Sequence, residues 1–412
     1  MSKLAILGGS PIGSVMSPKW PIWSQLEIDM VTDVVKSGEW GTNGPRQVEF
    51  EEKFSEYCSC KYGVMMTNGT HTLKLAMEAL GIGPGDEVIV PGSTWQATAS
   101  SVLDVNAVPI LVDITPDTYT IDPASIKAAI TSKTRAIIPV HIYGRVCDMD
   151  AVMHIAKKHD LWVIEDAAHQ HGSEWRGKKV GTIGNIGSFS LQLSKILNTG
   201  EGGVCLTNEK LLYDRMYSLK FCGRETYPGS PQMQSGNFRC NEFAAAIGIA
   251  QLTRLTEQNK LRHENALYLE DKLSKVDGIG ILRRDERVTF QAYYQLPLQY
   301  KQEQWNGIHR NKFIKAVRAE LNGSFSFSTP YTPLNNSELY SPFSKKTHKL
   351  SEEYCKAIDP SRFSMPVVER AYKDEYIGIF QHHLLAGKYE LDKLVDAVVK
   401  VRENIDELAT VE

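Results

Sequence analysis

The feature that most constrains this chain is a regular alternation of short apolar runs with helical patterns between about residues 60 and 207. Continuous Val- and Ile-rich strands separated by helices are typical of a mostly parallel sheet covered on both faces. In such sheets the functional groups gather at the carboxyl ends of the strands. The expected strands are 62–67, 87–91, 109–113, 136–141, 162–165, 188–190 and 203–207, and the expected helices are 72–80, 97–106, 123–131 and 149–159.

The pattern changes after Asn241, where a long helical stretch leads into a mixed region. At roughly 150 residues per domain, 412 residues suggest two or three domains. We predict an α/β fold with a large domain over 1–259 and a smaller α+β domain over 260–412, and we expect the segment 1–35 to be able to pack on the small domain. The expected elements are a helix over 242–274, a strand over 289–298, a helix over 312–321, a Pro-, Ser- and Tyr-rich loop through 343 and a helix over 390–408.

Charge and cysteine content exclude several classes of protein. Lys and Arg number 46 against 49 Asp and Glu, and a net charge of −3 does not favour a nucleic-acid or anionic-membrane partner. Seven cysteines without a paired C-x-x-C pattern are typical of reduced thiols in the cytosol. No apolar run reaches the roughly 18 residues of a membrane span, and the first nine residues lack a signal-peptide pattern. We therefore expect a soluble cytoplasmic enzyme.

The most specific local feature is a lysine between an apolar strand and a glycine-rich turn. Residues 188–195 read Ser-Phe-Ser-Leu-Gln-Leu-Ser-Lys, and residues 200–203 read Gly-Glu-Gly-Gly. The strand end would deliver Lys195 to the edge of the sheet where ligands bind. A lysine partly removed from water loses its proton more readily and can form a Schiff base with a carbonyl. Because a lone loop lysine is more often simply solvated, its neighbours must support the assignment.

A second buried strand ends in an acidic residue, in the sequence Trp-Val-Ile-Glu-Asp-Ala-Ala-His-Gln-His over 162–171. The carboxylate of Asp166 could pair with a protonated ring nitrogen, as a pyridoxal phosphate ring requires in order to act as an electron sink. The small side chain of Ala168 would let a flat ring lie against the backbone. The alternative for Asp166 alone is an ordinary helix cap.

Three further groups suit the same site. Residues 67–72, Thr-Asn-Gly-Thr-His-Thr, join a strand to a helix whose N-terminus could hold a phosphate, and they lack the Gly-Lys-Ser/Thr ending of a P-loop. Trp95 could stack on a planar ring, or could be a core residue. Residues 236–239, Gly-Asn-Phe-Arg, offer an amide and a guanidinium for an anion, or a solvated surface.

Two other patterns favour neither a dinucleotide nor a metal. The glycines between residues 8 and 13 are interrupted by Pro11, and no helix and strand with an acidic residue about 20 positions on follow them cleanly. His382 and His383 are adjacent, and adjacent residues on a strand face opposite sides. We expect a structural role for this pair and no metal site.

Four of these motifs, in this order and spacing, resemble the DegT/DnrJ/EryC1/StrS sugar aminotransferases, which are fold-type I pyridoxal-phosphate enzymes. The resemblance covers almost the whole chain, from residues 4–9 and Trp20-Pro21 to the final helix. Residues 190–195, Met-Pro-Val-Val-Glu-Arg over 365–370 and the His382-His383 pair are most similar to the branch that aminates scyllo-inosose and 2-deoxy-scyllo-inosose with L-glutamine. Many nucleotide-sugar enzymes carry Pro or His shortly before the lysine, where this chain has residues 191–193, Leu-Gln-Leu.

The resemblance implies a role for each matching residue. Lys195 would form the Schiff base with pyridoxal 5'-phosphate and move protons, and Asp166 would pair with its ring nitrogen. The position of Asn237 implies a homodimer, because this residue would reach the phosphate in the neighbouring subunit. The cofactor-binding residues would be Gly69, Thr70, Trp95, Asp166, His169, Ser190, Lys195 and Asn237, and the substrate-binding residues Trp20, Tyr143, Arg239 and Tyr331.

The implied activity is transfer of an amino group from L-glutamine or L-glutamate to a keto-cyclitol or keto-sugar in aminocyclitol or amino-sugar biosynthesis. Members with His in place of the lysine are dehydratases, and this chain keeps Lys195. Three alternatives stay open from the sequence. They are amination of a nucleotide-linked keto-sugar, an activity like that of 3-amino-5-hydroxybenzoate synthase, and a non-catalytic pyridoxal phosphate sensor.

Overall fold

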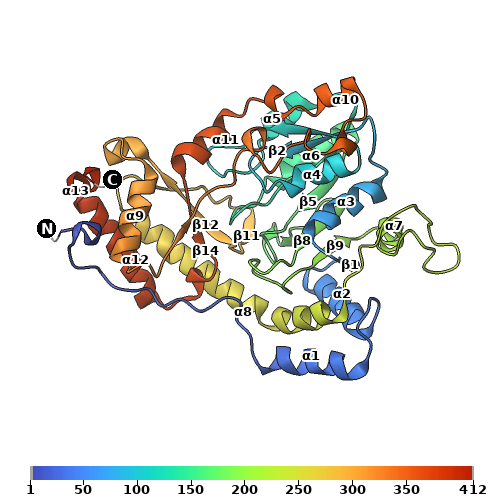
Figure 1. Cartoon of the computed structure of the whole chain (residues 1–412), viewed down its shortest axis with the longest axis horizontal. Coiled ribbons are helices and arrows are strands. Elements are labelled where there is room, and N and C mark those ends of the chain that lie inside the picture. Colours follow the sequence, from blue (N-terminus) through green and yellow to red (C-terminus); the bar gives the residue numbers. More distant parts are fainter. Residues whose placement is uncertain (1–2, 411–412) are drawn as a thin grey trace.

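The chain, in a computed structural model that describes residues 3–410, is built around one large sheet (Figure 1). Its seven strands lie in the order β1-β9-β8-β5-β4-β2-β3. In this spatial order, the strands β8, β5, β4, β2 and β3 are each parallel to the next, and β9 is antiparallel to both of its neighbours, β1 and β8. The predicted α/β class with a mostly parallel sheet is therefore confirmed. The strands are β1 (Tyr62–Met66), β2 (Glu87–Pro91), β3 (Val108–Val112), β4 (Thr134–Ile137), β5 (Trp162–Asp166), β8 (Ile186–Ser190) and β9 (Gly203–Thr207).

Helices between these strands pack their apolar stripes on the sheet. α3 (Gly69–Leu80) contacts β5, β8 and β9, and α6 (Met149–His159) contacts β4 and β5. α3 begins at Gly69 because the Asn68 side chain accepts a hydrogen bond from the His71 amide, which satisfies one free donor of the first turn. The remaining helices before α8 are α1 (Gln25–Ser37), α2 (Pro45–Tyr57), α4 (Ala97–Asp104), α5 (Pro123–Ala129) and α7 (Lys210–Lys220).

A second, smaller sheet is antiparallel throughout, in the order β10-β12-β14-β13. A third sheet of three short strands, β11-β6-β7, joins residues on either side of α8 in the sequence. These strands are β6 (Glu174–Trp175), β7 (Lys178–Lys179), β10 (Ile279–Ile281), β11 (Val288–Phe290), β12 (Gln295–Tyr300), β13 (Phe327–Ser328) and β14 (Tyr376–Phe380). The helices of this part are α8 (Glu242–Leu273), α9 (Arg310–Glu320), α10 (Glu352–Ala357), α11 (Pro366–Arg370), α12 (Lys388–Glu403) and α13 (Ile405–Ala409).

The long helix α8 belongs to two hydrophobic clusters. Ile249 and Leu255 in its first half pack in the cluster of the large sheet, and Leu269 and Leu273 in its second half pack in the cluster of the smaller sheet. Figure 1 shows α8 running beneath both parts, with α1 along its outer side. The predicted division of the chain at residue 260 falls inside this helix and remains a prediction.

Other segments also cross between the two parts. Leu4 and Val15 belong to the cluster of the smaller sheet, and the amide of Ala5 donates a 2.7 Å hydrogen bond to Glu320 in α9. Conversely, Met365 and Val368 come from the later part of the chain and pack in the cluster of the large sheet. The described part of the segment 1–35 does not pack as one unit, because Met30 and Val34 of α1 belong to the cluster of the large sheet. Packing of this segment on the small domain remains a prediction.

Several element boundaries differ from the sequence-based expectations. The expected strand 289–298 is two strands, β11 and β12, which belong to different sheets, and the buried residues 291–294 between them form no strand. The expected strand 136–141 lies at Thr134–Ile137, and the expected final helix is interrupted at Asn404 between α12 and α13. Helices α1, α2 and α7 were not predicted.

Within residues 3–410, no helix combines the length and apolar character that crossing a membrane requires. His382 and His383 follow strand β14 and do not lie on it, contrary to the expectation. The His383 ring stacks on Phe325 at 4.0 Å and hydrogen-bonds the Ser17 hydroxyl, which agrees with a structural role.

Candidate active site

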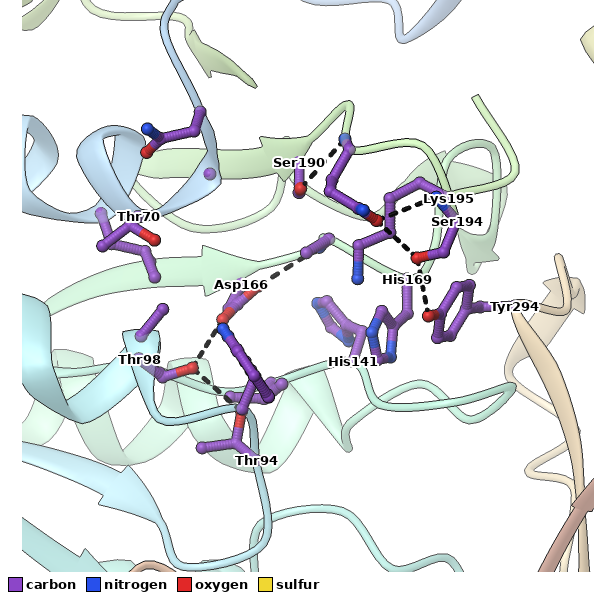
Figure 2. Close-up of a pocket in the computed structure, with 18 of the residues that line it drawn as sticks. Thr70, Thr94, Thr98, His141, Asp166, His169, Ser190, Ser194, Lys195 and Tyr294 are labelled. Atoms are coloured by element: carbon purple, nitrogen blue, oxygen red, sulfur yellow. Dashed lines mark hydrogen bonds between the residues drawn. The ribbon is translucent and has the colours of Figure 1, made fainter. Parts of the chain in front are cut away.

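A cavity of about 430 Å³ lies beside the carboxyl ends of β5 and β8 and the N-terminus of α3. Figure 2 shows the side chains that project into it. Residues from the large sheet form most of its wall, and Tyr294 and Tyr331 come from the later part of the chain. The lining residues are Asn68, Gly69, Thr70, Leu73, Thr94, Trp95, Ala97, Thr98, Val140, His141, Asp166, Ala168, His169, Ser190, Gln192, Ser194, Lys195, Glu201, Tyr294 and Tyr331.

Lys195 lies in the loop that joins β8 to β9. Its amide donates a hydrogen bond to the Gln192 carbonyl in a tight turn, which points the side chain into the cavity. Burial lowers the pKa of the Lys195 ammonium to about 8, although the carboxylate of Asp166 acts in the opposite direction. An amine with this pKa has a substantial neutral fraction near neutral pH, which a nucleophile or base requires.

Asp166 is buried at the end of β5, where two donors fix its carboxylate. Oδ2 accepts a 2.9 Å hydrogen bond from the Thr98 hydroxyl, and Oδ1 accepts a 3.2 Å bond from the Ala168 amide. Because the Thr98 hydroxyl donates its hydrogen bond to Asp166, the hydroxyl of Thr94, 2.9 Å away, donates to the Thr98 oxygen. Burial raises the pKa of the Asp166 carboxyl, and these hydrogen bonds partly offset that effect. A buried carboxylate without a cationic hydrogen-bond partner is suited to a cation that arrives with a ligand.

His169 is held as a neutral imidazole. Its Nδ1 accepts a 3.0 Å hydrogen bond from the Tyr143 amide, so the ring proton is on Nε2, which lies 3.4 Å from the Tyr331 hydroxyl. Burial, together with the nearby charge of Lys195, lowers the pKa of His169 well below its usual value. The ring therefore presents an N–H donor at the cavity without adding a charge.

The first turn of α3 and the end of β8 form a cradle suited to an anion. The backbone amides of a helix N-terminus have no partner within the helix and carry a partial positive charge. Gly69 opens this turn, and a Cβ at that position would lie 2.7 Å from Cβ of Ser190. The absence of a side chain at Gly69 therefore lets the amides of the turn and the hydroxyls of Thr70 and Ser190 face one small space.

The structure brings most of the predicted site residues together. Tyr143 is buried and does not line the cavity, and its hydroxyl accepts a 3.1 Å hydrogen bond from the amide of the lining residue Tyr331. Trp20 lies outside the lining set and donates from Nε1 to the Leu193 carbonyl at 2.9 Å. The predicted residues that line the cavity are Gly69, Thr70, Trp95, Asp166, His169, Ser190, Lys195 and Tyr331.

Asn237 and Arg239 lie outside the cavity, in the segment between α7 and α8. The Asn237 carbonyl oxygen accepts hydrogen bonds from the amide and Nε of Arg239 at 3.2 and 2.9 Å. Asn237 is exposed and Arg239 is half-buried. In this chain by itself, neither residue meets the site residues described above.

Eight lining residues with polar side chains were not predicted as site residues from the sequence. Thr94 and Thr98 lie four residues apart around Trp95, after the end of β2, and this spacing was a usable signal. Tyr294 carried no such signal, because it reaches the cavity from beside a different sheet. The eight are Asn68, Thr94, Thr98, His141, Gln192, Ser194, Glu201 and Tyr294.

The donor set suits a cofactor that has an aldehyde, a basic ring nitrogen and a phosphate. A reactive lysine, a buried carboxylate and a helix N-terminus with small and hydroxyl residues face one cavity, and the described residues include no cluster of three His, Cys, Asp or Glu that could hold a metal ion. This combination of fold and site defines a pyridoxal-phosphate-binding enzyme with a mostly parallel α/β sheet.

The chain belongs to the DegT/DnrJ/EryC1/StrS aminotransferase family, whose model matches residues 21–378. It is therefore a pyridoxal-phosphate-dependent aminotransferase. The resemblance inferred from the motifs is thus confirmed over most of the chain.

Individual relatives match over nearly their whole length. The chain is 39% identical to the L-glutamine:2-deoxy-scyllo-inosose aminotransferase of Streptoalloteichus tenebrarius, with 98% of this chain and 99% of the relative covered. It is 37% identical to the L-glutamine:scyllo-inosose aminotransferase of Streptomyces griseus, with 99% and 99% covered. Among solved structures, a 3-amino-5-hydroxybenzoic acid synthase is similar with a TM-score of 0.84 at 27% identity, covering 97% of this chain and 100% of the synthase.

Proposed function

We propose that this enzyme transfers an amino group from L-glutamine, or from L-glutamate, to the carbonyl of a keto-cyclitol. The observation that carries the proposal is the cavity in which Lys195 and Asp166 face a common space beside the anion cradle of α3. The curated relatives supply the chemistry of donor and acceptor, because two of them act with L-glutamine on scyllo-inosose or its 2-deoxy form.

We assign the phosphate to the first turn of α3, with Gly69, Thr70 and Ser190, and the ring to the space between Trp95 and Ala168. Pyridoxal phosphate supplies an aldehyde for the amino group and a ring that accepts electrons when its nitrogen is protonated. Asp166 holds that proton by charge, and Thr98 and the Ala168 amide keep its carboxylate in place. His169 offers its Nε2–H from the side of Tyr331.

Lys195 acts as the base and acid of the reaction. Its amine has a pKa of about 8, so near neutral pH it can take a proton from the carbon that bears the amino group and can return one. Proton movement is assigned to Lys195, because it is the only lysine of the lining and the ring nitrogens of His141, as well as Nδ1 of His169, already have protein hydrogen-bond partners.

The composition of the wall favours a neutral, polyhydroxylated acceptor. Among the residues that line the cavity, Lys195 is the only Lys or Arg, whereas the two phosphates of a nucleotide-linked sugar call for several cations. Hydroxyl and amide groups of Thr94, Gln192 and Ser194 can exchange hydrogen bonds with the hydroxyls of a cyclitol.

We further propose a cytoplasmic homodimer with shared sites. Asn237 is exposed in the segment before α8, and the family resemblance implies that this residue reaches the phosphate in a second subunit. The seven cysteines are free, which suits a reducing compartment. Mixing an inactive Lys195→Ala subunit with an inactive Asn237→Ala subunit should restore part of the activity if the sites are shared. No recovery from mixed dimers would contradict sharing.

The amination half-reaction tests the activity and the acceptor together. Enzyme in the pyridoxamine form is titrated with scyllo-inosose, 2-deoxy-scyllo-inosose and a keto-sugar nucleotide, and the cofactor spectrum is followed. We expect the pyridoxal spectrum to return with at least one keto-cyclitol and not with the nucleotide. Recovery with the nucleotide alone would overturn the cyclitol assignment.

The donor half-reaction provides the necessary control. Enzyme in the pyridoxal form should convert to the pyridoxamine form with L-glutamine or L-glutamate, and Lys195→Ala should not convert with either. A wild-type enzyme inert toward both donors, and active only in eliminating water from a cyclic substrate, would favour a reaction like that of the 3-amino-5-hydroxybenzoic acid synthase that it resembles in structure.

A further inference from the structure

Tyr294 reaches the candidate active site from the smaller sheet, immediately before β12. Tyr294 is 7% exposed, and its backbone is hydrogen-bonded on both sides. The Tyr294 amide donates to the Tyr143 carbonyl at 3.1 Å, and the Gln381 amide donates to the Tyr294 carbonyl at 3.1 Å. These bonds tie the backbone of Tyr294 to two separate segments beside the cavity.

The face of this ring lies against the reactive lysine. Nζ of Lys195 is 4.5 Å from the centroid of the Tyr294 ring, within the range of an attractive cation–π contact. The His169 ring stacks on the same tyrosine at 4.0 Å between centroids. Figure 2 shows Lys195, His169 and Tyr294 converging from different segments.

The hydroxyl of Tyr294 is tied to the loop that carries the lysine. It hydrogen-bonds the Ser194 hydroxyl at 3.0 Å, and the Ser194 hydroxyl also donates to Oε1 of Gln192 at 2.6 Å. Ser194 is the residue before Lys195, so this hydrogen bond fixes the Tyr294 ring relative to the loop that carries the Lys195 amine.

Few other groups at the cavity stabilise a positive charge on Lys195. Burial disfavours an ammonium, and Asp166 is the carboxylate that attracts it. Asp166 is assigned to the cofactor ring, so it is then shared with a second cation. The electron-rich face of an aromatic ring stabilises an ammonium without introducing a negative charge that would compete for that ring nitrogen.

We propose that Tyr294 is a positioning residue whose ring face holds the ε-ammonium of Lys195 whenever that group is not bonded to the cofactor, and so keeps the proton that Lys195 carries at the reaction site. The inference rests on the proposed role of Lys195 as base and acid. The hydroxyl of Tyr294 aligns the ring through Ser194.

The charge on Lys195 can be measured without any turnover. Cofactor-free enzyme is treated with an acylating reagent, which reacts only with neutral amines, and the labelling of the Lys195 peptide is followed by mass spectrometry across pH. In Tyr294→Met, loss of the ring should raise the labelling rate below pH 8 by about two- to tenfold. Tyr294→Phe keeps the ring and should label like the wild type.

Two comparisons separate this role from a merely structural one. Tyr331→Met removes an aromatic ring from the same cavity with no contact to the Lys195 amine, and it should leave the labelling profile unchanged. Phenylalanine analogues with increasing fluorine content at position 294 keep the shape of Phe and weaken the ring face, so labelling should rise with each fluorine. This series also covers the case in which Tyr294→Met does not fold.

Equal labelling of all variants would overturn the proposal, and so would a rise in Tyr294→Phe equal to that in Tyr294→Met. Failure of the donor half-reaction in the wild type would instead overturn the proposed function. The two outcomes are distinguishable, because labelling uses neither the cofactor nor a substrate.

Discussion

The hydroxyl of Thr98 donates a 2.9 Å hydrogen bond to Oδ2 of Asp166. Thr98 belongs to α4, which follows β2, and Asp166 is the last residue of β5. The bond therefore joins two segments that are far apart in the sequence. Together with the Ala168 amide, which donates to Oδ1, it holds the carboxylate in one orientation at the wall of the cavity.

Replacing Thr98 with Val removes this donor and keeps the shape of the side chain. Because hydrogen bonds to charged groups contribute about 1.5–3 kcal/mol, we expect cofactor affinity to fall by roughly tenfold or more. Equilibrium titration of cofactor-free enzyme with pyridoxal phosphate measures the change. Thr98→Ser retains the hydroxyl and should bind almost as tightly as the wild type, whereas equal affinity of Thr98→Val would show that the bond does not orient Asp166.

The pKa of about 8 for Lys195 predicts how covalent cofactor attachment depends on pH. Only the neutral amine reacts, so the rate of attachment to cofactor-free enzyme should rise with pH and level off above about pH 8. Rapid-mixing absorbance measurements between pH 6 and pH 10 provide the profile. A rate that still rises steeply at pH 10 would indicate an ordinary solvated lysine, whose pKa is about 10.4.

Adding one methyl group at Gly69 should disturb the phosphate cradle. The new Cβ would lie 2.7 Å from Cβ of Ser190, so the helix start and the strand end must separate. We expect Gly69→Ala to weaken cofactor binding and to reduce the stabilisation that the cofactor gives against heat. Gly41→Ala is the matched control, since a Cβ there meets nothing within 4 Å, and both effects should be absent.

A buried ion pair outside the lining of the cavity should contribute strongly to the free energy of unfolding. Nζ of Lys220 lies 3.0 Å from Oε1 of Glu51, and the lysine side chain is completely buried. Lys220→Met leaves the Glu51 charge without its partner and should cost about 3–5 kcal/mol in the free energy of unfolding, measured with denaturant.

The pair Lys53–Glu49 gives the comparison for this substitution. Its atoms are 3.7 Å apart and its side chains are 50% and 34% exposed, so Lys53→Met should change the free energy of unfolding by less than about 1 kcal/mol. Similar losses for the two variants would show that burial does not govern the contribution of Lys220.

Local patterns in the sequence predicted much of the fold. The bounds of β2 and α6 agree with the prediction, because an apolar run and a 3.6-residue period are both complete within those segments. The helix α1 was overlooked although its signal was present, since Ser24 and Glu27 form a capping box at its start.

The prediction of the site was limited by a different factor. Lys195 and Asp166 stand at ends of strands of one sheet, and the geometry of parallel sheets brings such ends together. Tyr294 depends on how a second sheet is placed against the first, which is decided by packing over the whole of α8 and leaves no trace in the residues around position 294. Asn237 remains a prediction, because a single chain does not contain its expected partner.

Helix α8 limits how this enzyme can be recombined with its relatives. A chimera that joins the first part of one enzyme to the second part of another near residue 260 would cut α8 between Leu255 and Leu269, which serve different cores. Each half of the helix would then stay with the core that it packs on. Crossovers placed before Asn241 or after Leu273 would instead set one half of the helix against a foreign core, so exchange of acceptor preference by shuffling should succeed near residue 260 and fail at the two ends of the helix.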